Sequence, residues 1–142
     1  FQVELDQRRA YLKAIEQESL SLKEKLEKLL IMHFKSINEN PALGKILARE
    51  HPTPMQNNFP TTIRDFVDGI PAQISRLLDE GVQNGEIRPC DTQMMAVAIF
   101  GSVGSVVLYA VGQDSKREQT RILQQAAAAL VDVYFQGLAS TR

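Results

Sequence analysis

The stretch TQMMAVAIFGSVGSVVLYAVGQ, residues 92–113, decides the fold because it holds no charged side chain. By length alone, such a helix could cross a bilayer. However, no Trp or Tyr belt marks both ends, no strong basic cluster anchors one side, and Gly101, Gly104 and Gly112 lower its hydrophobicity. We therefore interpret the segment as a helix that is buried on all sides in a soluble protein, with no membrane partner.

A chain of 142 residues is the size of one domain, and five or six helices rarely surround one helix completely. Another surface must then cover the rest of this helix. Small side chains would allow a second helix to approach closely, and they recur at Ala98, Gly101, Ser102 and Ser105. The uncharged helix therefore predicts a packing partner from outside the monomer.

The last helix, expected from Ser115 to about Leu138, supports the same prediction. Its apolar arc is wider than a one-sided surface helix needs. The two C-terminal helices therefore predict an intermolecular four-helix bundle between two copies of the chain, a homodimer with a two-fold axis. We expect four residues at its seam: Gly101, Ser105, Leu130 and Tyr134. In the alternative, both helices simply pack in the core of one monomer.

The whole chain predicts an all-α helical bundle of five to six helices. Two capping boxes, Ser21–Glu24 and Ser115–Glu118, each precede apolar residues at helical spacing. Long helices are expected at about residues 4–17, 21–39, 61–84, 92–111 and 115–138.

Prolines and glycines should punctuate the middle of the chain. Asn40 and Pro41 should open a short helix, and His51–Pro60 should be a loop. Pro71 should kink or break the helix of residues 61–84 near Gly69, because it removes a hydrogen bond and clashes with an earlier carbonyl. Gly85 should end that helix.

The composition excludes several classes of function. Hydrophobic residues make up 44% of the chain and the formal net charge is -1, so no net positive charge is available to attract nucleic acid or an anionic membrane. The single Cys90 cannot form an internal disulfide, and the N-terminus does not read as a signal peptide. These features fit a cytoplasmic protein.

No catalytic, metal or cofactor motif is recognisable. His33, His51 and Cys90 cannot form a zinc site at known spacings, and neither histidine follows a Glu by three residues. Phosphate-binding glycine loops and a nucleophile elbow are missing as well. We therefore predict no metal, no cofactor and no enzyme activity.

A ligand cavity is the remaining site that the sequence favours. His33 lies on an apolar stripe, so it is either a core histidine bonded to a polar group or a polar group that lines a cavity. A kink at Pro71 would hold helices apart near several aromatic side chains. We expect four residues to line the ligand pocket: His33, Phe66, Ile70 and Phe100.

Two segments resemble the regulatory domain of tetracycline-repressor-type (TetR family) transcription factors. The first is LLDEGVQNGEIRPCD, residues 77–91, followed by the apolar helix with Gly101, and the second is NPAL, residues 40–43. Their order and spacing match the family over roughly Ser21 to Leu138. The resemblance implies a body that dimerises through its last two long helices and holds a cavity for a small-molecule effector, apolar or amphipathic, among the central ones.

The resemblance also implies an N-terminal helix-turn-helix head that reads operator DNA. No segment of that type precedes the first long helix, and the chain starts at Phe1 without an initiator Met. We therefore expect residues 1–17 to be the remnant of a connector helix and residues 18–142 to be the sensing and dimerisation body, which contacts DNA only through the absent head. The alternative is a dimeric helical scaffold or adaptor that binds no ligand.

Overall fold

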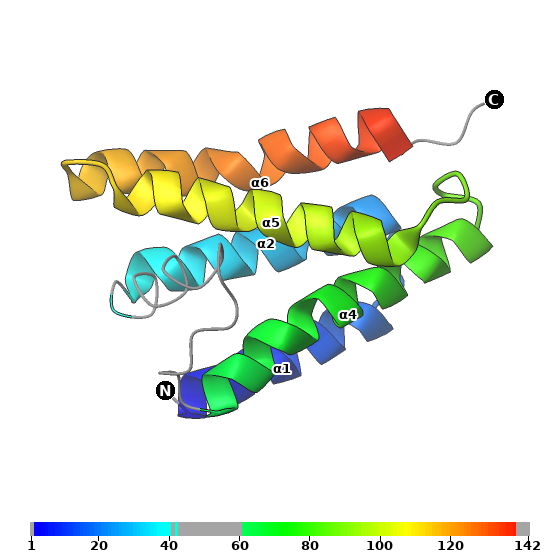
Figure 1. Ribbon diagram of the computed structural model, residues 1–142, viewed down its shortest axis with the longest axis horizontal. Coiled ribbons are helices and arrows are strands. Elements are labelled where there is room, and N and C mark those ends of the chain that lie inside the picture. Colours follow the sequence, from blue (N-terminus) through cyan, green and yellow to red (C-terminus); the bar gives the residue numbers. More distant parts are fainter. Residues whose placement is uncertain (1, 41, 43–60, 139–142) are drawn as a thin grey trace.

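A computed structural model describes residues 2–40, 42 and 61–138, and these residues form an all-α bundle without a β-strand (Figure 1). Five helices are described: α1 (Gln2–Gln17), α2 (Leu22–Glu39), α4 (Thr61–Gln83), α5 (Thr92–Val111) and α6 (Lys116–Leu138). The predicted all-α class and the five long helices are confirmed. The short helix expected after Asn40 and the loop expected at residues 51–60 lie outside the described residues.

Side chains cap the N-termini of α2 and α6 as the sequence predicts, except that the second capping box is incomplete. Ser21 Oγ accepts a hydrogen bond from Glu24 N at 3.2 Å, and a Glu24 carboxylate oxygen accepts one from Ser21 N at 3.4 Å, which completes the predicted capping box. At α6, Ser115 Oγ accepts from Glu118 N at 3.1 Å. The Glu118 carboxylate instead accepts from the Arg121 guanidinium, so the second box is only half formed.

The helix α4 continues through Pro71, so of the kink or break that the sequence predicts near Gly69, the break is wrong. Ile70 and Ile74 lie on either side of the proline, and both are buried in the same core. Because apolar contacts on both sides of Pro71 hold the two halves together, the loss of one backbone hydrogen bond does not end the helix.

The end of α4 also positions the start of α2. Gly85 adopts a φ of 75°, Glu86 N donates to Gly81 O at 2.8 Å, and Gly85 N donates to Val82 O at 3.1 Å. This is a Schellman motif, and it confirms Gly85 as the end of the helix. A methyl group on Gly81 would overlap Leu22 Cδ2, so glycine allows α4 to approach α2 closely without a shift of the Leu22 side chain.

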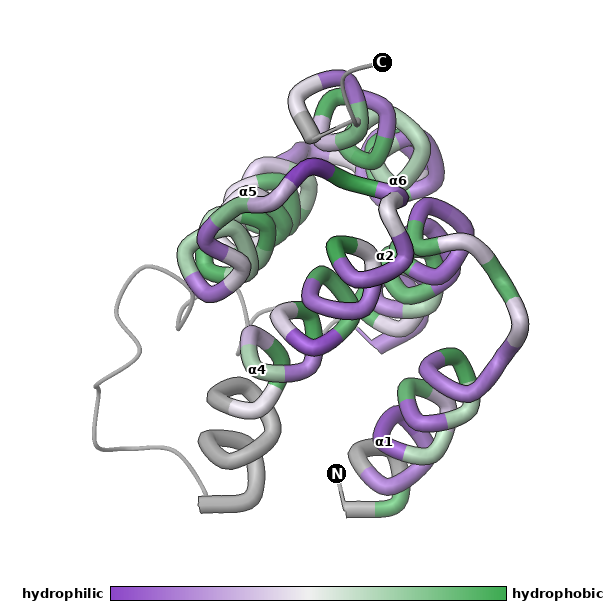
Figure 2. The backbone as a smooth tube through the Cα atoms, turned by 90° about the vertical axis from the view of Figure 1, so that its right-hand side faces the viewer, coloured by the Kyte–Doolittle hydropathy of each residue, from purple (hydrophilic) through white to green (hydrophobic). Residues whose placement is uncertain are grey.

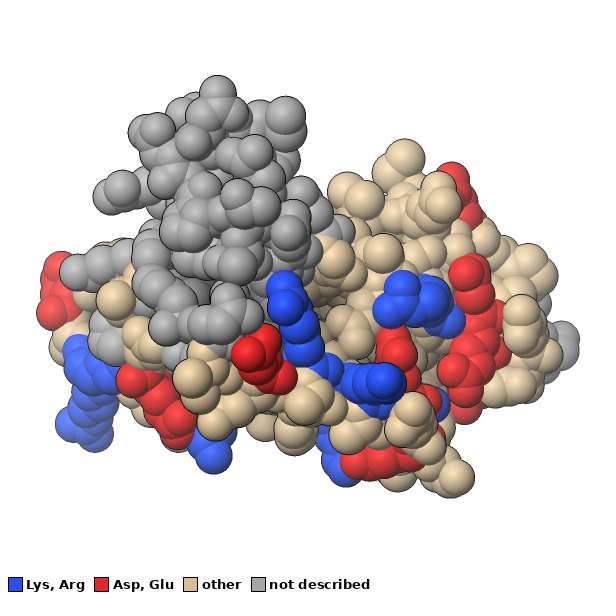
Figure 3. All heavy atoms as spheres, turned by 90° about the horizontal axis from the view of Figure 1, so that it is seen from below, with Lys and Arg blue, Asp and Glu red and all other residues tan. Residues whose placement is uncertain are grey.

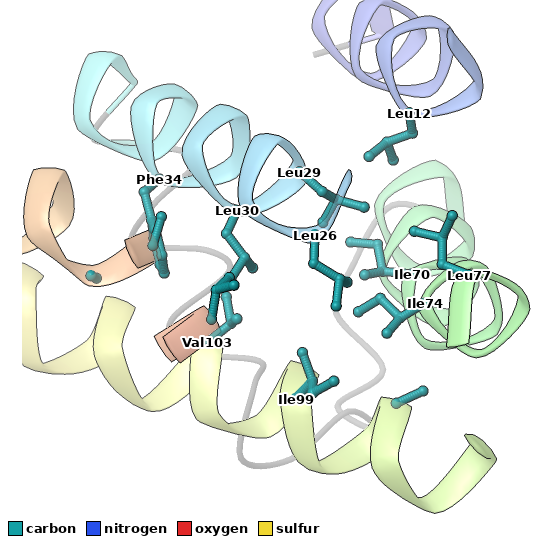
Figure 4. Packing of buried hydrophobic residues seen from close by; sticks show 14 of the residues in the cluster. Leu12, Leu26, Leu29, Leu30, Phe34, Ile70, Ile74, Leu77, Ile99 and Val103 are labelled. Atoms are coloured by element: carbon teal, nitrogen blue, oxygen red, sulfur yellow. The ribbon is translucent and has the colours of Figure 1, made fainter. Parts of the chain in front are cut away.

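The core lies where α2 meets α4 and α5 (Figure 4). Side chains from α2 point toward both neighbouring helices, and all are at most 5% exposed: Leu26, Leu29, Leu30 and Phe34. They meet Ile74 and Leu77 of α4 and Ile99 and Val103 of α5. On the other side of α2, α6 packs along its length. The helix α2 is therefore the centre of the bundle.

The helix α1 packs on α2 and α4 through Leu12 and Ile15, and polar contacts hold its C-terminal end. Lys25 is 4% exposed, and its ammonium donates to Glu16 O at 3.0 Å and lies 3.4 Å from Glu80 Oε1. Arg76 pairs with the Glu16 carboxylate at 3.3 Å. Figure 3 views the α1–α4 side, where Lys, Arg, Asp and Glu side chains are interspersed.

Candidate ligand cavity and apolar face

An interior cavity lies where α1, α2, α4 and α5 meet. Its volume is about 20 Å³, which is room for about one water molecule. Apolar side chains make up most of its wall, from Leu12, Leu29, Leu30, Met32, Ile70, Ile74, Phe100 and Val103. The structure thus places the predicted residues His33, Ile70 and Phe100 around one cavity. The side chain of Phe66 lies outside the described part of the chain.

Among the described residues, two polar side chains line this cavity, Arg8 from α1 and His33 from α2. Arg8 is 3% exposed and its Nη1 lies 3.3 Å from His33 Nδ1. Because a guanidinium can only donate, this contact makes Nδ1 the acceptor and leaves the proton of a neutral imidazole on Nε2. The predicted polar lining residue therefore sits against a buried permanent cation.

Arg8 is not among the predicted pocket residues, although its position in the sequence carries a signal. Arg8 lies four residues before Leu12 and seven before Ile15, so it shares the inward face of α1 with them. A charged residue on an otherwise apolar stripe indicates either a buried partner or a functional site. Lys25, which lies between Leu22 and Leu29 on α2, shows the same pattern and is buried as well.

A second, open hollow lies on the surface between α1 and α2. Its volume is about 470 Å³, and it is lined by Val3, Gln7, Arg8, Tyr11, Met32, Ser36 and Glu39. Arg8 and Met32 line both this groove and the interior cavity. These two side chains therefore stand between the interior and the surface.

The outward face of α5 is apolar and uncovered. Its large side chains are half to two-thirds exposed: Met94, Val97, Leu108 and Tyr109. Between them, Gly101 and Ser105 are exposed, and a Cβ on Gly101 would meet no atom within 4 Å. By length and composition this helix could cross a membrane, but a core helix of a soluble protein passes the same test, and a third of it is buried in the protein. One chain therefore leaves a face of α5 uncovered, as the sequence predicts, and the burial of that face by another surface stays a prediction.

The helix α6 extends this face and is tied to α5. Val133 is 65% exposed, whereas Leu130 and Tyr134 are half-buried. Ser102 Oγ donates to Ile99 O at 2.8 Å, so the Tyr134 hydroxyl donates in its contact with Ser102 Oγ. Burial raises the pKa of the Tyr134 phenol.

Within residues 2–40, 42 and 61–138, no cluster of three or more His, Cys, Asp or Glu residues could hold a metal ion. The described chain instead combines a small apolar cavity with a broad apolar face. An all-α bundle with these two features defines the class of a helical binding domain.

Comparison with known proteins gives the particular family. The chain matches the family model "Tetracyclin repressor-like, C-terminal domain" over residues 19–108. It therefore belongs to the TetR family of transcription regulators, as the resemblance in residues 77–91 implies. Regulators of this family are cytoplasmic and typically form dimers.

One similar solved structure is the Clostridium perfringens "putative fatty acid metabolism regulator". The two chains are 26% identical and superpose with a TM-score of 0.66. The match covers 90% of this chain and 68% of the other. No curated protein matches the chain.

Proposed function

We propose that this chain is the effector-binding and dimerisation domain of a TetR-like repressor. The observation that carries the proposal is the interior cavity, because α1, α2, α4 and α5 all contribute side chains to it. A ligand that binds there would contact every helix around it and would favour one arrangement of the bundle over another.

The effector we propose is apolar or amphipathic, because most of the cavity wall is apolar. The printed name of the Clostridium perfringens neighbour, which concerns fatty acid metabolism, is consistent with such a ligand. The cavity now has room for about one water. Binding would therefore have to displace side chains or helices, and this displacement is the signal that a regulator needs.

The partner we propose for the α5–α6 face is a second copy of the chain. Exposed Val97, Leu108 and Val133 would be costly to leave in water, and the exposed Gly101 and Ser105 would let a helix of the second copy approach closely. Leu130 and Tyr134 would complete the seam from α6. A two-fold axis would then join α5 and α6 of both copies in a four-helix bundle.

The mechanism we propose is a shift between two populations of the dimer. We assign residues 1–17 to a connector and residues 18–142 to the body, with DNA contacted only by a head on the N-terminal side of α1. The two heads of such a dimer must lie about 34–36 Å apart to meet two half-sites. Nearly complete switching requires the effector to favour one state by about 5 kcal/mol.

Thermal unfolding with a panel of saturated fatty acids and their alcohols tests the cavity. At saturating concentrations, at least one of them should raise Tm by several degrees, because a ligand that binds only the folded state stabilises it. The variant Ile70→Trp fills the cavity and should lose that rise, whereas Ile31→Trp, on the exposed side of α2, should keep it.

A dimeric scaffold without a ligand is the second candidate, and the small volume of the cavity favours it. If no compound raises Tm in the wild-type chain, or if Ile70→Trp leaves the rise unchanged, the sensing function at this cavity is wrong. The scaffold would then be the better description.

A further inference from the structure

We propose that the effector is an amphiphile with an anionic head group, which stays in the α1–α2 groove at Arg8 while its apolar tail passes Met32 into the interior cavity. This inference rests on the proposed function, since it names the ligand class and the orientation for the same cavity.

The surface groove and the interior cavity together provide the proposed path for the ligand. The surface groove measures about 470 Å³ and the interior cavity about 20 Å³, and Arg8 and Met32 line both. The interior alone has room for about one water. A ligand that occupied both spaces could bury its tail without fitting entirely inside. The polar and apolar ends of the ligand would then match the wet and dry ends of the path.

Arg8 sets the charge of the head group. A guanidinium stays protonated and offers several donors in one plane, which suits the two oxygens of a carboxylate or phosphate. His33 lies beside it at 3.3 Å and adds a second polar group at the same end of the cavity. Among the described residues that line the groove, Glu39 is the one acid, and it does not line the interior cavity. Arg8 is 3% exposed, so a head group in the groove would reach its guanidinium only once the N-terminal part of α1 parts from α2.

Met32 provides the passage. The side chain is half-buried, and its sulfur lies 3.8 Å from the Ser36 hydroxyl at the groove. An unbranched methionine changes rotamer easily and adapts to irregular apolar surfaces. Rotation of Met32 would therefore connect the groove with the cavity and would then give the tail of the ligand an apolar neighbour.

The position of the groove links this path to α1. The described residues that α1 contributes to the groove lie between Val3 and Tyr11, in its N-terminal two-thirds. The contacts with Lys25 and Arg76 hold Glu16 at the opposite end. An entering ligand would therefore part the N-terminal part of α1 from α2 while the C-terminal end of α1 stays in place.

Three probes with the same tail and different heads test the proposal by isothermal titration calorimetry: decanoate, decanol and decyltrimethylammonium. Wild-type protein should bind decanoate at least about tenfold more tightly than decanol, which is the scale of one charged hydrogen bond. Decyltrimethylammonium should bind most weakly. Arg8→Gln should abolish the preference for decanoate, Arg8→Lys should retain part of it, and the control Arg9→Gln, at an exposed neighbour, should retain all of it.

The outcomes separate this inference from the function on which it rests. Equal binding of the three probes to the wild-type chain, or an unchanged preference in Arg8→Gln, would overturn the head-group assignment and leave the cavity as a ligand site. If none of the three binds, the cavity does not accept such chains, and the inference fails together with the proposed function.

A measurement on the wild-type protein avoids any effect of substitution on folding. The chain has four methionines, which can carry ¹³C-methyl labels. On addition of decanoate, the Met32 methyl signal should shift, whereas the signal of Met94, which is 63% exposed on the outer face of α5, should not. A shift at Met94 without one at Met32 would place the ligand on the apolar face and overturn the proposed path.

Discussion

The helices α2 and α5 are similar in length and pack in the same core, yet their outer faces differ completely. The exposed positions of α2 are mostly charged, at Lys23, Glu24, Lys28, Lys35 and Glu39, and Ile31 is the large apolar exception. The exposed positions of α5 include no charged residue. In Figure 2, green predominates along α5, whereas purple and green alternate along α2.

The two helices differ in how much of their apolar surface one chain buries. The helix α2 has one apolar face, and one core buries it, so water can cover the rest. The helix α5 has more apolar surface than its own chain buries, since Met94 and Val97 stay about 60% exposed. This uncovered apolar surface supports the proposal that a second copy of the chain covers α5.

A negative charge placed on the outer face of each helix should give the largest difference in dimer Kd between α5 and α2. Leu108 on α5 and Ile31 on α2 are both 50% exposed, which makes them a matched pair. Leu108→Glu should raise the dimer Kd at least about 30-fold, because it places a carboxylate in an apolar interface twice per dimer. Ile31→Glu should leave the Kd unchanged. Analytical ultracentrifugation measures both, and a dimer that loses affinity only with Ile31→Glu would move the interface to α2.

Substitutions at two glycines should have smaller effects, one on dimer affinity and the other on the free energy of unfolding. A side chain at Gly101 meets no atom of its own chain, so Gly101→Leu should spare the fold but weaken the dimer by about 1–3 kcal/mol through overpacking. Gly81→Ala should instead lower the free energy of unfolding by about 1 kcal/mol, since its methyl group would overlap Leu22 within the core. Sedimentation and urea unfolding distinguish the two, and an unchanged dimer in Gly101→Leu would remove that residue from the seam.

The smallest expected effect is a pH dependence at Tyr134. Its pKa is raised from 10.0, so the folded chain holds the phenolic proton more tightly than the unfolded chain does. The stabilisation is fully present below pH 10 and should be lost as pH rises through the folded pKa. Urea unfolding of wild type and Tyr134→Phe at about pH 9 and about pH 11 should show a steeper loss in wild type. Parallel losses would contradict a role for this phenol.

The sequence predicts best what short-range chemistry determines. Ser21, Asp91 and Gly85 act on backbone groups within a few residues, so their capping roles can be read before the fold is known. Of the kink or break expected near Gly69, the break is wrong, because contacts with distant α2 outweigh the local cost of Pro71. Tertiary packing decides that balance, and no local pattern reports it.

In the candidate site too, the sequence predicts some features, whereas only tertiary packing determines the others. A stripe of apolar residues predicts that His33, Ile70 and Phe100 face inward, and the structure gathers them around one cavity. The contact of Arg8 with His33 joins residues 25 positions apart, and periodicity alone does not pair them. The volume of the cavity depends on how closely α1 packs, which only the assembled bundle determines.

The buried Lys25 fixes the C-terminal end of α1, so that the helix could pivot around this end. A rod of 16 residues is about 24 Å long, and its C-terminal end is fastened by the Lys25 contact with the Glu16 carbonyl. A tilt of about 10° around that point would carry the far end through about 4 Å. Arg8 lies about halfway along this lever, so a displacement there would be nearly doubled at the N-terminal end of α1.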